Sequence, residues 1–563
     1  MATTSKLASS LMEKIAAMRA AKEAAQTTTL ATLPPSPATE IAEVVAEIPT
    51  TTTVSATDRN GQAITYNAKQ QEAVNLISTG QSCVVIGAAG TGKTTLQKGS
   101  TGQLMANGML PTLNADHKYL AKSAPGIAIC AYTRRATNNI RRNMSADLQG
   151  NCITIHKLLE YAPEEIVVVD DEGKEKTSRI FVPGRNAENP LPPNLHTIII
   201  EEASMVSVEL FNEILAACPH NPQFVFLGDI QQLPPVFGSA ILGYKMLELP
   251  VVELTEVYRQ ALESPILSLA YRILSGSPIS KSDMIAMHVP KKLTLHPWKK
   301  KIDPDSATIT LAKFFIKQLE QGTYNPDEDG ILIPFNKSCG TDELNRHIAT
   351  KIAQLQFKPV YEIFHSWKKS YYSVGDKCLY EKEDAVIKSI YPNPKFTGMM
   401  PRAESLDLDY WGHSASPSSD ANNTEDVDSF LSYIQVGETT DGEKKQRAAS
   451  HCIQLQLLDS ERTVTISSAG ELESLTLGYA ITVHKSQGSE WDKVFLCFHH
   501  SHASMIQREL LYTAVTRAKQ ELFCICEADT FEKGILRQRI KGATWQEKAE
   551  YFKGKIEANE LQS

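Results

Sequence analysis

The sequence has no long apolar run, no excess of positive charge and no paired cysteine motif. No stretch approaches the roughly 18 apolar residues that a membrane-spanning helix needs, which argues against an integral membrane protein. The formal net charge is −8, so any contact with nucleic acid has to come from a local basic groove. The ten cysteines are scattered without a CxxC pair. A disulfide framework and a zinc module are therefore not indicated, and a reducing cytoplasm is the expected location.

The length of 563 residues is too great for one hydrophobic core, so we expect several domains. Residues 1–25 are typical of a short amphipathic helix, and residues 26–57 are rich in Thr, Ala and Pro. Such a composition predicts a disordered segment. The helix is either a docking site for a protein partner or part of a frayed tail.

A glycine-rich motif between a predicted strand and a predicted helix is the centre of the sequence. Cys83–Ile86 is a short apolar run typical of a buried parallel strand. The glycines that follow let the backbone close around phosphate, with amides and a helix N-terminus facing the negative charge. We expect Lys93 to reach the β- and γ-phosphates of a nucleoside triphosphate and Thr94 to hold Mg²⁺. The predicted nucleotide-binding residues here are Gly87, Ala88, Ala89, Gly90, Thr91, Gly92, Lys93, Thr94 and Thr95.

Polar side chains follow two further predicted strands. Glu201 and Glu202 come directly after an apolar run. In an ATPase of this kind one acid holds Mg²⁺ through water and the next is the general base for the attacking water. Gln232 follows the strand Phe224–Asp229 and could sense the γ-phosphate. Gln70 lies on a predicted helix before the glycine motif and either reads the adenine edge or is an ordinary polar helix residue.

Hydroxyl and basic side chains gather at the ends of other predicted elements. Thr133 and Arg134 end one strand, and Thr154, His156 and Lys157 follow the next. These are the groups that contacts to a phosphate backbone need, although a solvated basic face has the same composition. Residues 165–182 predict a β-hairpin with the acidic turn Asp170–Gly173.

The order of these motifs resembles the superfamily 1 helicases. The stretches that carry the resemblance are Gly87–Thr94, Ala131–Thr133, Thr154–Leu159, Glu201–Ser204, Gly228–Val236, Tyr258–Gln260, Val483–Gly488 and Ala514–Lys519. The Gln-Leu-Pro-Pro-Val and His-Lys-Ser-Gln-Gly forms are similar to the RecD and Dda branch rather than the UvrD or Rep branch. Within that branch, the motifs resemble most those of phage replication helicases of the Dda type. The matching motifs run from about residue 67 to about residue 519.

The resemblance implies an ATP-dependent helicase that moves 5′→3′ on single-stranded DNA and unwinds duplexes, with ATP and Mg²⁺ as cofactors. The fold class implied is α/β, with two RecA-like P-loop domains, a β-hairpin pin and an SH3-like β-barrel insertion. The catalytic residues it implies are Lys93, Glu202, Gln232, Arg259 and Arg517. Further nucleotide contacts fall on Gln70, Gly488 and Glu490, and metal contacts on Thr94 and Glu201. The DNA-binding positions implied are Thr133, Arg134, Thr154, His156, Lys157, Pro234, Pro235, Thr482, His484 and Lys485.

The implied domains are a tail at 1–60, a first motor domain at 61–255 with the hairpin at 160–190, a second at 256–350 and 475–563, and an accessory domain at 351–474. Strands of the accessory domain are predicted at Tyr372–Leu379 and Cys452–Leu458, and its acidic segment at about 401–447 is expected to be disordered. That segment is either a protein-partner site or a solvated insertion.

Two positions depart from the family pattern. The family has Asp-Glu where this chain has Glu201-Glu202, and we expect an active ATPase, with a slowed one as the alternative. The hairpin tip is acidic rather than aromatic, which argues against strand separation by stacking at the tip. A translocase that does not unwind, and a nucleotide-regulated DNA-binding protein with weak ATPase, are the rival functions. RNA as the substrate stays open.

The expected partners are single-stranded DNA and fork junctions, with replication or recombination proteins at the tail or the acidic segment. Because Arg517 and Lys93 are in one chain, a monomer can complete its own site. A host cytoplasm is expected if the source is a phage. The cluster Cys497, His499, His500 and His502 fits no common zinc spacing and is interpreted as a loop.

Overall fold

The computed structural model describes residues 66–112, 125–169, 175–235, 238–257, 263–298, 302–365, 368–380, 383–396, 448–458, 462–542 and 544–560. The predicted N-terminal helix and tail, the acidic segment and Arg259 lie outside these residues. The hairpin residues 163–180 belong to a different compact unit from the rest of the described chain. No described helix is long and apolar enough to cross a membrane.

The first half of the chain forms a parallel sheet with strand order β2-β3-β7-β8-β1-β9, and β4 pairs with β3. Strands β1, β3 and β8 are buried along their whole length, which is why each reads as a continuous apolar run. The bounds of the strands are β1 Cys83–Gly87, β2 Leu110–Pro111, β3 Gly126–Ala131, β4 Cys152–Thr154, β7 Leu195–Glu201, β8 Gln223–Gly228 and β9 Val251–Leu254.

Helices cover both faces of this sheet. Alternate residues of one strand therefore enter different hydrophobic clusters. Val84 and Ile86 of β1 pack in one cluster, and Cys83 and Val85 pack in the other. The helices are α2 Ala68–Ser78, α3 Lys93–Ala106, α4 Arg134–Asn143, α5 Ala146–Gln149, α6 Ile155–Leu158, η1 Ala203–Met205, α7 Val208–Ala217 and α8 Ile241–Glu248.

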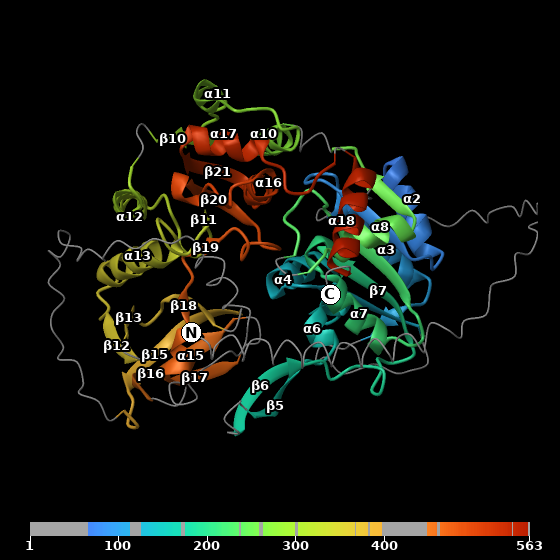
Figure 1. Ribbon diagram of the computed structural model, residues 1–563, viewed down its shortest axis with the longest axis horizontal. Helices are drawn as coiled ribbons and strands as arrows, with labels where there is room; N and C mark the ends of the chain where they lie inside the picture. The colour runs from blue at the N-terminus through green and yellow to red at the C-terminus, as the bar shows by residue number, and fades with distance from the viewer. Residues whose placement is uncertain are drawn as a thin grey trace, which may run out of the picture. The chain divides into compact units, whose positions relative to one another are not determined.

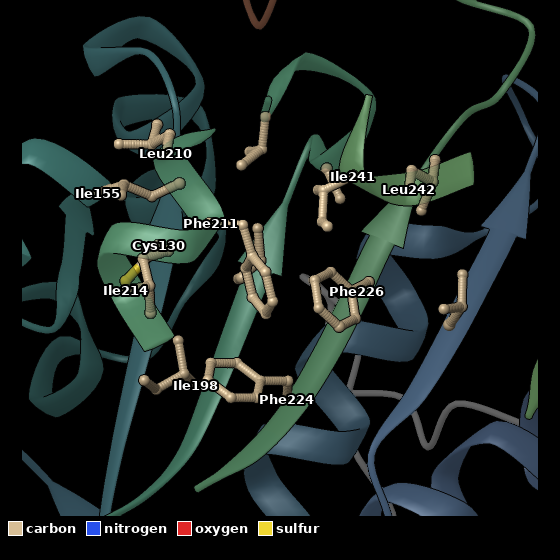
Figure 2. Packing of buried hydrophobic residues seen from close by; sticks show 14 of the residues in the cluster. Cys130, Ile155, Ile198, Leu210, Phe211, Ile214, Phe224, Phe226, Ile241 and Leu242 are labelled. Atoms are coloured by element: carbon tan, nitrogen blue, oxygen red, sulfur yellow. The ribbon is translucent and has the colours of Figure 1, made fainter. Parts of the chain in front are cut away.

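Aromatic packing fixes α7 on this sheet. The Phe211 ring lies 5.2 Å from the Phe224 ring and 5.3 Å from the Phe226 ring, measured between centroids, as Figure 2 shows. Such tilted and edge-on contacts add to the free energy gained by burying the rings. Helix α7 is thereby packed against β8 through three aromatic rings.

The second half forms another parallel sheet, with strand order β10-β21-β20-β11-β19. Its strands are β10 Leu293–Pro297, β11 Gly330–Ile333, β19 Ala480–Thr482, β20 Trp491–Phe498 and β21 Ala518–Cys526. Its helices are α10 Pro265–Leu274, α11 Lys281–Ala286, α12 Pro304–Glu320, α13 Thr341–Leu355, η2 His500–His502, α16 Arg508–Val515 and α17 Ala528–Leu536.

A third sheet is inserted between α13 and β19, and it is antiparallel. Its order is β17-β16-β15-β14-β18, and β12 and β13 form a separate pair. The elements are β12 Tyr361–His365, β13 Lys368–Tyr372, β14 Lys377–Tyr380, β15 Glu383–Pro392, β16 Ala448–Leu457, β17 Thr463–Ser468, α15 Ala469–Glu473 and β18 Thr476–Leu477. The predicted α/β class with two parallel sheets and an inserted antiparallel sheet is confirmed.

The prediction of one strand over Tyr372–Leu379 is wrong. Strand β13 ends at Tyr372 and β14 begins at Lys377. Between them Ser373 N donates to Asp376 Oδ2 at 2.6 Å, and Gly375 has a φ of +96° that only glycine adopts without strain. The sequence Ser-Val-Gly-Asp is therefore a turn.

In the separate unit the predicted hairpin is present as strands β5 Ala162–Val169 and β6 Glu175–Val182, which pair with each other. The acidic turn that was predicted as its tip, Asp170–Gly173, lies outside the described residues.

The C-terminal helix α18, Trp545–Glu560, packs against α8 of the first half (Figure 1). Ile540, Ala549 and Phe552 belong to the hydrophobic cluster of the first sheet. A Cβ on Gly243 would lie 2.5 Å from the Phe552 ring, so glycine at that position allows the close approach. The chain thus returns to the first sheet after completing the second.

Candidate functional site

The glycine motif forms a tight loop between β1 and α3, as the sequence predicts. Gly90 and Gly92 have φ values of +83° and +85°, which side-chain-bearing residues rarely adopt. The Lys93 ammonium donates to the carbonyl oxygens of Gly87 at 2.6 Å and of Ala88 at 3.1 Å. The loop therefore closes around its own lysine, at the N-terminus of a helix whose first amides face outward as an anion site.

Two carboxylates end strand β7 beside this loop. Glu202 has a φ of +50°, a conformation that costs free energy for a residue other than glycine. Its Oε2 is buried and has no hydrogen-bond partner in the described chain, although the residue as a whole is half-buried. Strained backbone and an unsatisfied buried oxygen occur together at this one position, as they do at functional sites.

The charges around these carboxylates identify their neighbours. Burial and the negative charge of Glu202 raise the pKa of Glu201 to about 8, against the opposing effect of the Lys93 cation. Burial also raises the pKa of Glu202, while the Arg517 and Lys93 cations oppose that rise. Lys93, Glu201, Glu202 and Arg517 are thus close enough to influence one another.

The segment after β8 is held by the second half of the chain. Arg517 Nη2 donates to Gln232 Oε1 at 3.2 Å, and both residues are buried. The amide of Leu233 donates to Thr513 Oγ1 at 3.0 Å, and Gln487 Nε2 donates to the Leu233 carbonyl at 3.0 Å. The structure therefore brings together Gln232 and Arg517, two of the predicted catalytic residues.

Three other predicted nucleotide contacts have structural partners. Gln70 closes the capping box of α2 with Asn67, at 3.2 Å, and its Nε2 lies 3.5 Å from the Gly92 carbonyl. A Cβ on Gly488 would lie 2.8 Å from Thr133 Oγ1, so glycine there permits contact between the two halves. Glu490 pairs with Lys519 at 3.1 Å.

The predicted DNA-binding residues of the first half lie at the ends of β3 and β4. Thr133 Oγ1 accepts from Ala136 N at 3.1 Å and caps α4, and Thr154 caps α6 through Lys157 N at 3.1 Å. The His156 ring lies 5.6 Å from the Tyr132 ring. Because Tyr132 precedes Thr133, the two strand ends are neighbours.

Arg134 has a partner within the protein: it forms an ion pair with the buried Glu383 at the start of β15. Next to it, Arg135 binds Asp384 through two hydrogen bonds, of 2.9 Å and 2.5 Å. Such bidentate arginine–carboxylate pairs are among the stronger polar contacts. The inserted sheet is therefore attached to α4, the helix that Thr133 caps.

The predicted DNA-binding residues of the second half follow β19. Thr482 is buried, and its Oγ1 accepts from Lys485 N at 3.3 Å. Burial, aided by the nearby Arg539 cation, lowers the pKa of His484 to about 4, so this side chain is neutral at physiological pH. The Lys485 carbonyl accepts from Arg135 Nη1 at 3.2 Å. Pro235 is buried and Pro234 is half-buried.

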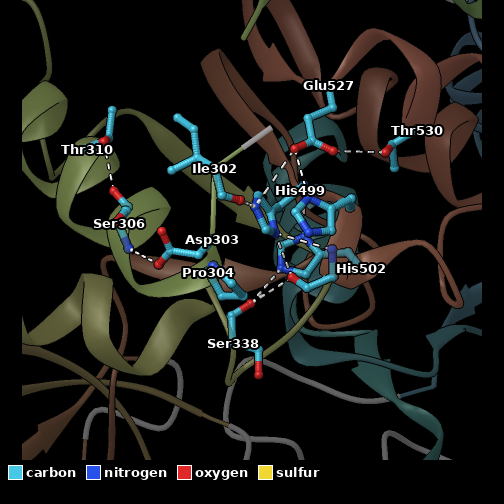
Figure 3. A network of polar contacts seen from close by, with 12 residues as sticks. Ile302, Asp303, Pro304, Ser306, Thr310, Ser338, His499, His502, Glu527 and Thr530 are labelled. Atoms are coloured by element: carbon cyan, nitrogen blue, oxygen red, sulfur yellow. Dashed lines mark hydrogen bonds and ion pairs between the residues drawn. The ribbon is translucent and has the colours of Figure 1, made fainter. Parts of the chain in front are cut away.

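The histidines after β20 lie at and within the short helix η2, and they are hydrogen-bonded to neighbouring segments, as Figure 3 shows. His499 Nε2 lies 2.7 Å from the Ile302 carbonyl oxygen, His500 Nδ1 lies 2.8 Å from Glu527 Oε1, and His502 Nε2 lies 3.2 Å from the Ser338 carbonyl oxygen. The ligand atoms of His499, His500 and Glu527 lie within 4.8 Å of one another, which a metal could use. The prediction of a loop is wrong, because Cys497 lies in β20 and His500–His502 form η2.

Sequence reasoning missed the tyrosines that connect the halves. Tyr512 contacts both Ala89 and Asp229, and Tyr271 contacts the Ala89 carbonyl. Both tyrosines lie among helix residues with no glycine or charge pattern around them. Of the two, only Tyr512 lies close to a motif of the sequence analysis, two residues before Ala514–Lys519.

Comparison with protein families identifies two segments. Residues 70–238 match the model of an AAA domain, and residues 477–525 match that of a UvrD-like helicase C-terminal domain. The first segment contains the glycine loop, Glu202 and Gln232, and the second contains Arg517. Each predicted catalytic residue in the described chain thus falls within a matched segment.

The chain is also similar to curated relatives. It is 26% identical over 426 residues to the ATP-dependent RecD2 DNA helicase of Deinococcus radiodurans, which covers 73% of this chain and 44% of that relative. It is 21% identical over 494 residues to the RecBCD enzyme subunit RecD of Buchnera aphidicola, covering 83% of this chain and 74% of that relative. The chain therefore spans less than half the length of the first relative.

Among solved structures, the Pif1 helicase from Candida albicans is similar at 17% identity and a TM-score of 0.40, covering 88% of this chain and 100% of that chain. A TM-score of this size supports no argument about the fold, which rests on the sheets described above.

Proposed function

We propose that this chain, which by sequence belongs with the RecD-type branch of the superfamily 1 helicases, is an ATP-dependent DNA helicase that moves 5′→3′ on single-stranded DNA and unwinds duplexes. The observation that supports this most is the contact between Arg517 and Gln232 beside the phosphate loop and Glu202. An arginine and a γ-phosphate sensor from different halves of one chain make hydrolysis depend on how the halves meet.

In this proposal Lys93 leaves the Gly87 and Ala88 carbonyls and binds the β- and γ-phosphates. Glu202 takes the proton of the attacking water, a role helped by its raised pKa, which brings the carboxylate nearer the operating pH. Gln232 lies near the γ-phosphate and senses it. Arg517 stabilises the charge that develops on the transferring phosphoryl group. Arg259 is proposed as a second arginine.

Magnesium fits the residues that are present. Thr94 and Glu201 would hold the ion, and the pairing of two carboxylates beside a phosphate loop, one with an unpartnered buried oxygen, suits a hard cation. When bound, the ion neutralises charge on the phosphate oxygens. Gln70, Gly488 and Glu490 are proposed as further contacts to the nucleotide.

The DNA strand is proposed to cross the segments that follow β3, β4, β8 and β19. The residues proposed to contact it are Thr133, Arg134, Thr154, His156, Lys157, Pro234, Pro235, Thr482, His484 and Lys485. Contacts of this kind are made mainly to the phosphate backbone and weaken with salt. For Arg134 to take part, its ion pair with Glu383 has to open.

The finer assignments are part of the same proposal. The hairpin β5–β6 acts as the pin that divides the duplex, and the third sheet is an SH3-like accessory domain. The two parallel sheets are RecA-like motor domains with the boundaries predicted from the sequence, except that α18 packs with the first sheet and not the second. A monomer acting at forks, and a Dda-type phage source, are the expected setting.

The test is ATP hydrolysis with and without single-stranded DNA, with Lys93→Ala as the blank. Strong stimulation by DNA that the variant loses supports the motor, and duplexes with a 5′ or a 3′ tail then reveal the direction of movement. Unwinding of the 3′-tailed duplex alone would contradict the proposed direction.

Two other outcomes separate the rival functions. DNA-stimulated hydrolysis without strand separation on either duplex would identify a translocase. Tight DNA binding without turnover would identify a nucleotide-regulated binding protein and overturn the proposal.

A further inference from the structure

We propose that Tyr512 is a positioning residue that fastens the phosphate loop to the second half of the chain and sets the placement of Arg517. The proposal rests on the proposed function, and it adds a residue that the motif roles leave unassigned. Tyr512 lies on α16, and only 1% of its surface is exposed. A hydroxyl so deeply buried has to find its partners within the protein.

The phenol of Tyr512 has two partners in the first half. The amide N–H of Ala89, in the phosphate loop, donates to the Tyr512 oxygen at 2.8 Å. The Tyr512 O–H donates to Asp229 Oδ2 at 2.7 Å. Because a peptide N–H can only donate and a phenol has one proton, the direction of both bonds is fixed. Burial and the Asp229 carboxylate hold the pKa of Tyr512 well above its usual value, so the proton stays in place.

These bonds are part of a closed circuit. Asp229 Oδ1 accepts from Gln231 N at 3.0 Å and so shapes the segment that carries Gln232. Gln232 accepts from Arg517, whose Nε donates to the Thr513 carbonyl at 3.0 Å, next to Tyr512. The phosphate loop, the Gln232 segment and Arg517 therefore share one rigid connection through α16.

A second tyrosine holds the other side of the same residue. Tyr271, on α10, donates its O–H to the Ala89 carbonyl at 3.0 Å. Helix α10 packs against α16. Both backbone polar groups of Ala89 are thus bound by side chains of the second half.

The position of Ala89 connects this clamp to nucleotide binding. Lys93 donates to the neighbouring Ala88 carbonyl, and phosphate would draw that ammonium away. The Ala88–Ala89 peptide then has to readjust while Tyr512 holds its N–H and Tyr271 holds the carbonyl of the next peptide. The adjustment passes to α16 and therefore to Arg517, so an occupied loop and a correctly placed arginine occur together.

The direct test is hydrogen–deuterium exchange of the phosphate loop without nucleotide, followed by mass spectrometry. Tyr512→Phe keeps the ring and removes the acceptor of the Ala89 amide, so exchange there should be roughly fivefold faster. Tyr372→Phe is the matched control, because that buried phenol donates to the Leu475 carbonyl at 3.1 Å in the third sheet. Its phosphate loop should exchange as in the unchanged protein.

The kinetic test separates positioning from nucleotide binding. In Tyr512→Phe, kcat for DNA-stimulated hydrolysis should fall roughly tenfold while KM for ATP changes less than about twofold, because ground-state binding of ATP does not need the misplaced arginine. Tyr271→Phe should give a smaller fall in the same direction. Both variants should retain the melting temperature of the control variant.

Unchanged exchange at the phosphate loop in Tyr512→Phe, or an unchanged kcat in a DNA-stimulated enzyme, would overturn the proposal. If the unchanged protein hydrolyses no ATP, the proposed function fails, whereas the exchange measurement still decides whether Tyr512 holds the loop. If Tyr512→Phe does not fold, Tyr271→Phe, which frees the Ala89 carbonyl, supplies the kinetic measurement, and an unchanged kcat in that variant would overturn the proposal.

Discussion

Each parallel sheet has an acidic side chain directly after one of its strands, but the surroundings of the two side chains differ. Glu202 follows β7 of the first sheet, with a left-handed backbone and an oxygen that has no partner in the described chain. Glu527 follows β21 of the second sheet, where Oε1 accepts from His500 at 2.8 Å and Oε2 accepts from Thr530 at 3.2 Å. One carboxylate is kept unsatisfied by the fold, and the other completes a network.

The difference shows how a shared architecture divides its tasks. A buried polar group without a partner costs free energy, so such a group persists where it serves a reaction. A satisfied network fixes loops and is worth more to stability than to chemistry. On this reasoning we propose that the first sheet edge carries the reaction and that the second edge, with its histidines, serves stability.

The largest expected effect is on hydrolysis. Glu202→Gln should lower kcat for ATP by roughly 10²–10⁴-fold, the usual worth of a general base, while ATP affinity changes little. The matched substitution Glu527→Gln should leave kcat near that of the unchanged protein. Steady-state hydrolysis with saturating single-stranded DNA measures both, and an equal loss in the two variants would remove the distinction between the edges.

The next effect is on stability, with opposite signs. Glu202→Gln removes a buried charge of raised pKa and should increase the free energy of unfolding by about 1 kcal/mol. Glu527→Gln weakens the bonds to His500 and Thr530 and should lower it by roughly 1–2 kcal/mol. Urea unfolding followed by circular dichroism measures both changes. A stabilising Glu527→Gln would show that the second network is strained.

The last effect is on the pH dependence of stability, which changes gradually over several pH units. Glu201 has a folded pKa of about 8 against an ordinary 4.5, so its contribution is present below pH 4.5 and is lost as the pH rises toward 8. Burial lowers the pKa of His502 to about 4 from 6.5, so its contribution is present above pH 6.5 and is lost as the pH falls toward 4. Each slope is at most about 1.4 kcal/mol per pH unit.

Unfolding curves across this range test the two signs separately. Glu201→Gln should flatten the loss of stability on the alkaline side, and His502→Gln should flatten the loss on the acidic side. If both substitutions altered the same limb, at least one of the two environments would differ from the one described.

Local chemistry was readable in the sequence, and distant contacts were not. The glycine loop, the strand ending at Glu201 and the helix that carries Gln70 follow from short patterns with a local cause, whereas the two parallel sheets were implied by the resemblance to helicases. The contact of Tyr512 with Ala89 joins residues 423 positions apart, and that of Arg135 with Asp384 joins residues 249 apart. Nothing local marks either pair.

The prediction of one strand over Tyr372–Leu379 was wrong for a different, local reason. Its alternation of side chains fits a strand, but a backbone bond to Asp376 and the left-handed Gly375 make the middle a turn. A glycine and an aspartate in series were the warning. Where the roles of Glu202, Gln232 and Arg517 are concerned, the sequence-based assignment stays a prediction until hydrolysis is measured.

The packing of α18 on α8 has a consequence for the order in which the protein is made. As a chain leaves the ribosome, the residues of the first sheet emerge early, but Ala549 and Phe552, which join its core, emerge only after the second sheet and the inserted sheet. Until then the surface of α8 around Gly243 faces water instead of the Phe552 ring. In the nascent chain, the core of the first half therefore stays incompletely covered until a segment encoded hundreds of codons later has been translated.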